Sequence, residues 1–167
     1  MKEIPENCIS VSAGAVAKAW HYASKEDTRK ALHGVHLRPC AGGGVNVIAT
    51  DGRCAFFHFD AIGTAPGPLT LQISKAFAKT CERLKMNRIV VSGGRLCIRD
   101  HTGIEMAAQP GAALHDAEYP DVRKIIPDLK EYRIGLNADI NPHFAFKAAK
   151  ALGKMYRLYS HKDGGIK

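Results

Sequence analysis

Short apolar runs separated by turn residues occupy the chain from 29 to 60 and predict a β-meander. The runs at 32–37, 45–50 and 54–59 are rich in the β-branched and aromatic residues that strands favour. The turn segment PCAGGG lies between the first two runs, and DGR lies between the last two. A parallel pair needs a crossover of about a dozen residues, so strands joined this closely must pair antiparallel. A sheet of this kind has an apolar face that needs a covering helix.

Apolar residues spaced three and four positions apart predict three helices. The first covers 12–24 and begins at Ser12, the second covers 74–85 and is capped by Ser74, and the third covers 141–154. The other segments are predicted as strands at 69–74, at two or three places in 87–109, at 132–140 and at 156–161, and as a charged loop at 24–30.

These elements form an internal repeat with a period of about 60 residues. The order strand, helix, strand, strand, strand occurs twice and begins a third time. Two such modules side by side would place two helices on one face of a continuous antiparallel sheet, which is an α+β arrangement. We therefore predict one domain with two repeated modules at 1–127 and the start of a second, truncated domain at 128–167.

Basic residues recur at three- and four-residue steps along each predicted helix, away from its apolar stripe. They are Lys18, His21 and Lys25, then Lys75, Lys79 and Arg83, then Lys147, Lys150 and Lys154. The chain has 24 Lys and Arg residues against 16 Asp and Glu, a formal net charge of +8, which favours a polyanionic partner. Three corresponding stripes predict contacts with nucleic-acid phosphates, which would bind without reading sequence. The alternative is a set of merely solvated helix faces.

Candidate catalytic and metal-binding groups are sparse. His33 and His36 are three apart on a predicted strand, so their side chains should point to opposite faces and cannot share a metal ion. The glycines at 42–44 lack the Lys-Ser/Thr of a phosphate-binding loop. Paired carboxylates are missing. We predict no catalysis, cofactor or metal, while an enzyme that uses Cys40 or Cys54 with a histidine stays as an alternative.

The five cysteines are an odd number without a C-x-x-C pair, which favours reduced thiols in a cytosolic protein. The first ten residues lack the apolar core of a signal peptide. Apolar runs fall short of the ~20 residues that cross a bilayer. We expect a soluble, cytoplasmic protein that does not enter a membrane.

Three motifs stand in order along the middle of the chain. They are Arg29-x-x-Leu32-x-Gly34-Val35, then IATDGR at 48–53, then YPDVRKIIP at 119–127. Together they resemble the bacterial DNA polymerase sliding clamp, or β-clamp, family over about 120 residues. In that family they mark the middle one of three domains and the linker to the third. The resemblance implies the sliding-clamp fold, with helices lining the inside of a ring around DNA and no catalytic role.

The resemblance also implies two sets of site residues. The DNA-binding set would be Lys18, Lys25, Arg29, Lys30, Lys75, Lys79, Arg83, Lys147 and Lys150. The partner-peptide pocket, in which polymerases insert a short linear motif, would be formed by Leu32, Thr50, Gly52, Arg53, Ala55, Pro120 and Ile125. The implied partners are double-stranded DNA, a DNA polymerase, proteins with clamp-binding peptide motifs, and a clamp loader.

The sequence departs from the family in several respects. The first domain has no counterpart, the third is cut short, Cys54-Ala55 replaces a basic and a larger aliphatic residue, and the net charge is positive where relatives are usually acidic. An unfinished sheet leaves an edge that tends to pair with another chain, so we expect a homo-oligomer or a piece of a longer protein. Whether Lys167 is the natural end stays open.

The leading hypothesis is a DNA-replication protein, the β-subunit type of processivity factor for a DNA polymerase, from a phage or mobile element. It would bind duplex DNA without sequence specificity. The alternative is a clamp-derived protein-interaction or regulatory module that no longer encircles DNA.

Overall fold

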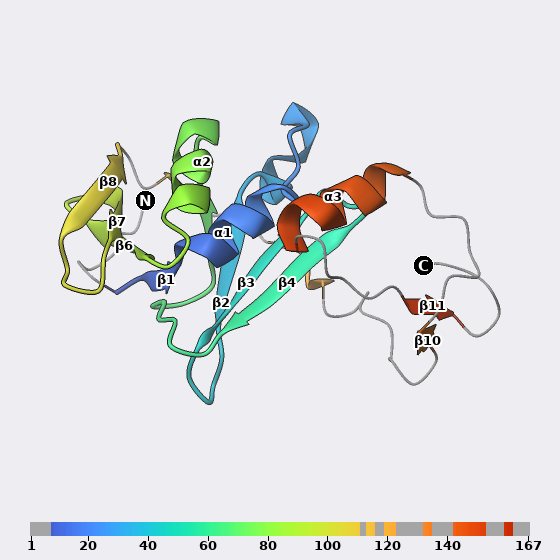
Figure 1. Cartoon of the computed structure of the whole chain (residues 1–167), viewed down its shortest axis with the longest axis horizontal. Helices are drawn as coiled ribbons and strands as arrows, with labels where there is room; N and C mark the ends of the chain where they lie inside the picture. Colours follow the sequence, from blue (N-terminus) through green and yellow to red (C-terminus); the bar gives the residue numbers. More distant parts are fainter. Residues whose placement is uncertain are drawn as a thin grey trace. The chain divides into compact units, whose positions relative to one another are not determined.

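The computed structural model describes residues 8–110, 113–115, 119–122, 132–134, 142–152 and 159–161 (Figure 1). The chain divides into two compact units, Met1–Tyr119 and Pro120–Lys167. The predicted domain division at 127 stays a prediction.

The first unit contains the two repeated modules. The first module comprises β1 (Ser10–Ser12), α1 (Ala13–Trp20), the 3-10 helix η1 (Asp27–Leu32), β2 (Val35–Pro39), β3 (Val45–Thr50) and β4 (Ala55–Asp60). The second comprises β5 (Leu69–Gln72), α2 (Lys75–Arg83), β6 (Arg88–Ser92), β7 (Arg95–Arg99) and β8 (Glu105–Gln109), and β9 (Ala113–His115) follows. The predicted order of elements, the α+β class and the meander of β2, β3 and β4 are confirmed.

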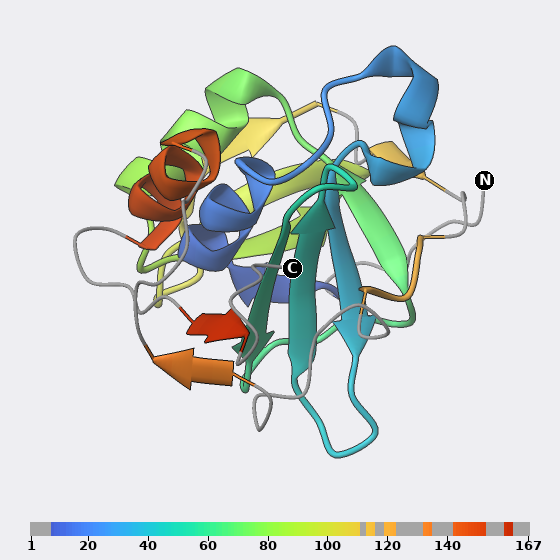
Figure 2. The same ribbon diagram turned by 90° about the vertical axis from the view of Figure 1, so that its right-hand side faces the viewer.

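The two modules exchange their first strands (Figures 1 and 2). Strand β1 pairs antiparallel with β6 of the second module, and β5 pairs antiparallel with β2 of the first. The described strands of the first unit thus form two sheets, ordered β4-β3-β2-β5-β9 and β1-β6-β7-β8. The prediction of one continuous sheet was wrong, because each module completes the other module's sheet instead of extending its own.

Hydroxyl caps fix the starts of both helices. The Ser12 Oγ accepts a hydrogen bond from Ala15 N at 3.2 Å, and the Ser74 Oγ accepts one from Phe77 N at 3.1 Å, as the sequence predicted. Helix α1 ends at Trp20 rather than at 24, and a turn leads from it into η1.

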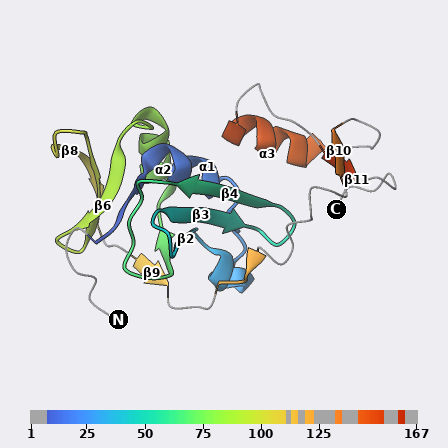
Figure 3. The ribbon, with the colours of Figure 1, turned by 90° about the horizontal axis from the view of Figure 1, so that it is seen from below.

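Helices α1 and α2 pack beside each other over the sheets of the first unit (Figure 3). On α1 the buried positions are mostly alanines, so its backbone can approach its neighbours closely. A Cβ added to Gly14 would lie 2.8 Å from the Lys85 carbonyl oxygen just beyond α2. The core beneath the helices includes Val16, Leu37 and Ile89, all fully buried.

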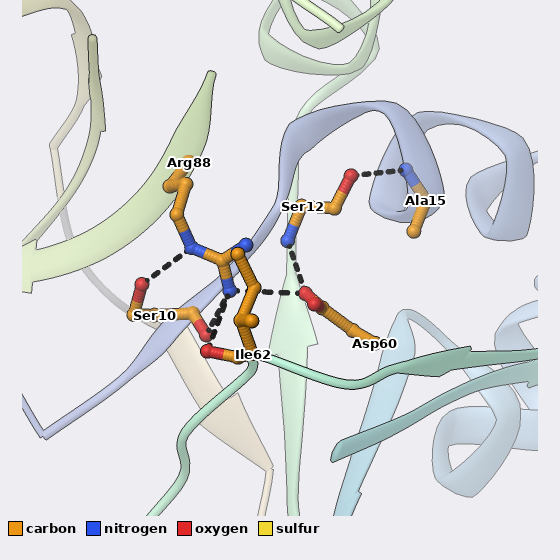
Figure 4. A network of polar contacts seen from close by, with 6 residues as sticks. All are labelled: Ser10, Ser12, Ala15, Asp60, Ile62 and Arg88. Atoms are coloured by element: carbon orange, nitrogen blue, oxygen red, sulfur yellow. Dashed lines mark hydrogen bonds and ion pairs between the residues drawn. The ribbon is translucent and has the colours of Figure 1, made fainter. Parts of the chain in front are cut away.

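A buried ion pair joins the two modules (Figure 4). Arg88 on β6 donates from Nη2 to Asp60 Oδ2 at 3.0 Å and from Nε to Ser10 Oγ at 2.7 Å. The same carboxylate oxygen accepts a hydrogen bond from Ser12 N at 2.8 Å. Asp60 closes β4 of the first module and is only 6% exposed, so the pair links β4, β1 and β6.

Several boundaries differ from prediction. Leu32 lies in η1 rather than in the strand, and Gly34 has φ +119, which no regular strand adopts, so β2 starts at Val35. The charged loop predicted at 24–30 largely becomes η1. No residue range was predicted for β1, the first strand of the repeat, and β9 was not predicted; each has only three residues.

The second unit contains α3 (Pro142–Leu152) and an antiparallel pair of β10 (Tyr132–Ile134) with β11 (Tyr159–His161). The helix confirms the prediction for this segment. The rest of the predicted strand at 132–140, from 135 onward, lies outside the described residues. In the described part of the chain, no helix combines the length and hydrophobicity needed to cross a membrane.

Candidate nucleic-acid interface

Helix α2 presents a row of three cations to solvent. Lys75, Lys79 and Arg83 are four residues apart and all exposed, while Phe77, Ala78 and Cys81 on the opposite side are buried. Four-residue steps bring side chains onto one face of a helix, so the three charges form a continuous row. Among the described residues none of the three has an ion-pair partner. The row is therefore available to an external anion.

Helix α1 contributes fewer free charges than its sequence suggested. Lys18 is exposed, but His21 Nε2 lies 2.7 Å from Glu82 Oε1 and so connects α1 to α2. Lys25 is exposed beyond the helix end, and its Nζ lies 4.6 Å from the centre of the Trp20 ring. A cation over an indole face is held in place while its N–H groups stay accessible.

Arg29 differs from the other predicted DNA contacts because its guanidinium already has partners. Its Nε lies 3.2 Å from Glu26 Oε2, and its Nη1 donates to the Asp51 carbonyl at 2.8 Å. Lys30 belongs to the same 3-10 helix, but its side chain lies outside the described residues.

The remaining predicted DNA contacts belong to the second unit. On α3, Lys150 is exposed with its Nζ 5.1 Å from the centre of the Phe146 ring, and Lys147 is half-buried. Their contribution to one surface with α1 and α2 stays a prediction.

Part of the predicted peptide pocket does come together, around the tight turn between β3 and β4. Gly52 has φ +86, and a Cβ added there would lie 3.8 Å from Leu32 Cδ1 and 2.6 Å from Arg29 Nη1. The Thr50 hydroxyl accepts from Gly52 N at 3.0 Å and donates to Cys54 O at 2.8 Å. The turn and η1 are thus close neighbours.

Two other predicted pocket residues lie at the same turn. Arg53 follows Gly52 directly, Ala55 pairs with Thr50 across β3 and β4, and both are exposed. Pro120 is exposed and belongs to the second unit, and Ile125 lies outside the described residues. The complete pocket therefore stays a prediction.

Sequence reasoning missed a ring pair beside this turn. The rings of His36 and Tyr119 stack with centroids 4.3 Å apart and planes 4° apart. His36 Nδ1 lies 3.0 Å from Thr70 Oγ1, and burial, followed by the nearby Arg38, lowers the pKa of His36 to about 4. Tyr119 begins the YPDVRKIIP motif, which is the signal that could have pointed to it.

Burial raises the pKa of Tyr119 to about 12, although the Thr50 backbone acts in the opposite direction. The buried hydroxyl has no hydrogen-bond partner among the described residues. The aromatic ring is therefore held by stacking rather than by its hydroxyl.

A hollow of about 210 Å³ lies between the C-terminal end of α1, the residues that follow η1, and the end of β5. Trp20, Lys25, His33 and Gln72 are among its lining residues. It shares only Lys25 with the predicted DNA set and none of the predicted pocket residues.

The two cysteines considered as nucleophiles have other contacts. Cys40 Sγ accepts from Asn46 Nδ2 at 3.1 Å, and Cys54 Sγ donates to Asp51 Oδ1 at 3.4 Å. Neither contact supplies the cationic neighbour that activates a thiol. Within the described ranges, no group of three or more His, Cys, Asp or Glu residues could hold a metal ion.

No protein-family model and no curated protein matches this sequence. Solved structures do match. The β subunit of the Streptococcus pyogenes DNA polymerase is 17% identical, with a TM-score of 0.55 over 80% of this chain and 38% of that chain. The β subunit of Thermotoga maritima DNA polymerase III is 16% identical, with a TM-score of 0.53 over 79% of this chain and 37% of that one.

The Bacillus subtilis DNA polymerase sliding clamp is 16% identical, with a TM-score of 0.50 over 80% of this chain and 37% of that clamp. This chain has the sliding-clamp fold. It spans little more than a third of the length of these clamps. The clamp fold confirms the predicted architecture, and at such identities it shows the fold alone.

Proposed function

We propose that this clamp-fold chain is a non-catalytic, cytoplasmic protein that binds duplex DNA without sequence preference and serves as a processivity factor for a DNA polymerase. The observation that carries the proposal is the exposed row of Lys75, Lys79 and Arg83, opposite the buried face of α2. Helix α1 lies beside α2 and adds Lys18, so the cations come from two packed elements.

Phosphates are the natural partner for such a row. Lysine and arginine side chains on a helix face neutralise backbone charge and release counterions, but they do not read bases. The surplus of eight positive charges adds long-range attraction to any duplex. Lys25, Arg29, Lys30, Lys147 and Lys150 belong to the same proposal.

The test is the salt dependence of binding to a fluorescent random-sequence duplex, followed by anisotropy. We expect a steep decline of affinity with salt. Replacing Lys75, Lys79 and Arg83 by glutamine should reduce the slope of log K against log salt by about three, because each lost phosphate contact removes about 0.9. If the wild-type chain does not bind the duplex even at low salt, the proposal is refuted.

The matched control removes the same charge elsewhere. Arg38, Arg95 and Arg99 lie on β2 and β7 rather than on a helix. Their triple glutamine variant should leave the salt slope close to that of the wild-type chain. If both triple variants reduce the slope equally, net charge rather than the α2 row is responsible.

The proposed protein partners are a DNA polymerase, clamp-binding peptides and a clamp loader. Support comes from the close approach of Leu32 and Gly52, two of the positions implied for the peptide pocket. We further propose assembly into a homo-oligomer. Strands β4 and β8 end their sheets among the described strands, which leaves edges for pairing.

A second candidate is a protein-interaction or regulatory module that does not encircle DNA. Phe57 and Phe59 favour it, because both side chains project from β4, at the end of its sheet, with 42% and 51% exposure. The molar mass in solution distinguishes the candidates, since a strict monomer of this length cannot encircle a duplex.

A further inference from the structure

Arg29 is a predicted DNA contact that also binds the β3–β4 turn, which belongs to the predicted peptide pocket. Its Nη1 donates to the Asp51 carbonyl at 2.8 Å, and its Nε lies 3.2 Å from Glu26 Oε2. Gly52 lies directly against this guanidinium, since any Cβ there would be 2.6 Å from Nη1. The side chain therefore ties η1 to the β3–β4 turn.

The turn itself is a unit held by internal hydrogen bonds. Asp51 Oδ1 accepts from Arg53 N and from Cys54 N, both at 2.9 Å, and Thr50 Oγ1 bridges Gly52 N and Cys54 O. The Asp51 carbonyl is the group that Arg29 holds from outside. A change at Arg29 should therefore shift the whole turn relative to η1 rather than unravel it.

We propose that Arg29 is a positioning residue through which DNA binding releases the β3–β4 turn from η1. The proposal rests on the proposed function. The Arg29 side chain is 41% exposed, so a phosphate can reach it. A guanidinium offers two bidentate edges, Nε with Nη2 and Nη1 with Nη2. Glu26 already contacts Nε of the first edge, and the Asp51 carbonyl contacts Nη1 of the second.

A phosphate that binds Arg29 in a bidentate manner must therefore displace one of the two partners. Both contacts are charge-assisted because the guanidinium is charged, but only the contact with Glu26 joins two opposite charges, which adds Coulomb attraction between ions. The phosphate thus displaces Asp51. By reciprocity, a peptide that holds the turn against η1 weakens DNA binding by the same factor.

Cys54 offers a native reporter inside this turn. Its half-buried thiol donates to Asp51 Oδ1 at 3.4 Å. The experiment measures the rate of iodoacetamide labelling at Cys54 by mass spectrometry, on the full chain with and without a random-sequence duplex. We expect the duplex to raise the rate about fivefold or more, a typical coupling. Cys40, in the loop after β2, provides the internal control and should not respond.

Three variants separate coupling from stability. Arg29→Ala should label rapidly without DNA and show no further response to it. Arg29→Lys should keep its attraction to phosphate but lose the bidentate guanidinium. We therefore expect it to bind duplex, while its Cys54 is labelled as fast as in Arg29→Ala whether or not duplex is present. Glu26→Gln weakens the contact between residue 26 and Arg29 Nε. The phosphate should then bind at the Nε edge and leave Asp51 in place, so the DNA-induced increase in the Cys54 labelling rate becomes smaller.

The outcomes are distinct from those of the proposed function. If the chain binds duplex but the rate of Cys54 labelling is unchanged or lowered, the proposed role of Arg29 is overturned and the proposed function stands. Failure to bind duplex at low salt removes both. A wild-type increase that persists in Arg29→Ala also overturns the inference, because the signal then arises elsewhere.

Discussion

Replacing His36 should remove a large part of the acid sensitivity of the first unit. The ring stacks on Tyr119 and its Nδ1 lies 3.0 Å from Thr70 Oγ1. Burial and the charge of Arg38 lower the pKa of His36 from 6.5 to about 4. The folded state thus keeps this imidazole neutral where an unfolded chain would protonate it.

The direction of the effect follows from proton linkage. Above the unfolded pKa of 6.5 the histidine is neutral in both states, so it contributes no pH dependence. As pH falls below that value the unfolded state binds the proton first, and the free energy of unfolding decreases until pH reaches about 4. At about pH 5 this single group should lower the free energy of unfolding by about 2 kcal/mol relative to neutral pH.

The assay is urea unfolding followed by the fluorescence of Trp20, which is the single tryptophan and lies in α1 of the first unit. Asparagine keeps an amide near the position of Nδ1 and can still bond Thr70, so His36→Asn removes the titration with little change of shape. His101→Asn, at an exposed turn, is the matched control. Parallel pH profiles for the wild-type chain and His36→Asn would refute the assignment.

Two further predictions concern the ion pair and the turn. Asp60→Ala should lower the free energy of unfolding by about 3–5 kcal/mol in urea titrations, because it leaves Arg88 charged, partly buried and without its ion-pair partner. The double variant with Arg88→Met should recover part of this loss. If the losses of the two single variants simply add in the double variant, the two residues are not coupled. Gly52→Asp should abolish affinity for a clamp-binding peptide, measured by anisotropy, because the new side chain would meet Arg29 and a φ of +86 disfavours any residue with a side chain. The control variant Arg95→Gln, on β7, should keep its affinity. Equal affinity in both variants would exclude this turn from the pocket.

Local patterns in the sequence were sufficient for most elements. Serine caps and alternating apolar residues depend on neighbours a few positions apart, so α2 and the strand at 45–50 could be predicted from local sequence. Strand β1 could not, because its three residues carry almost no periodicity and its partner β6 is about 80 positions away. The salt bridge between Asp60 and Arg88 depends on that same exchange of strands and was equally invisible.

The candidate site was predictable to the extent that helical spacing determines it. Spacing alone placed Lys75, Lys79 and Arg83 on one exposed face. It could not show that His21 binds Glu82 of the neighbouring helix, or that Arg29 is engaged by Asp51. Those contacts arise from tertiary packing, which brings side chains together from distant positions.

The strand exchange explains why α1 and α2 pack beside each other. Strand β1 lies in the sheet of the second module, and α1 follows it immediately, so α1 must cross from that sheet to the first module's sheet. Strand β5 and α2 make the reverse connection. Either module alone would lack one strand of its sheet and expose the edges of β2 or β6. The pair must therefore fold together, and the same core that closes both sheets holds α1 against α2.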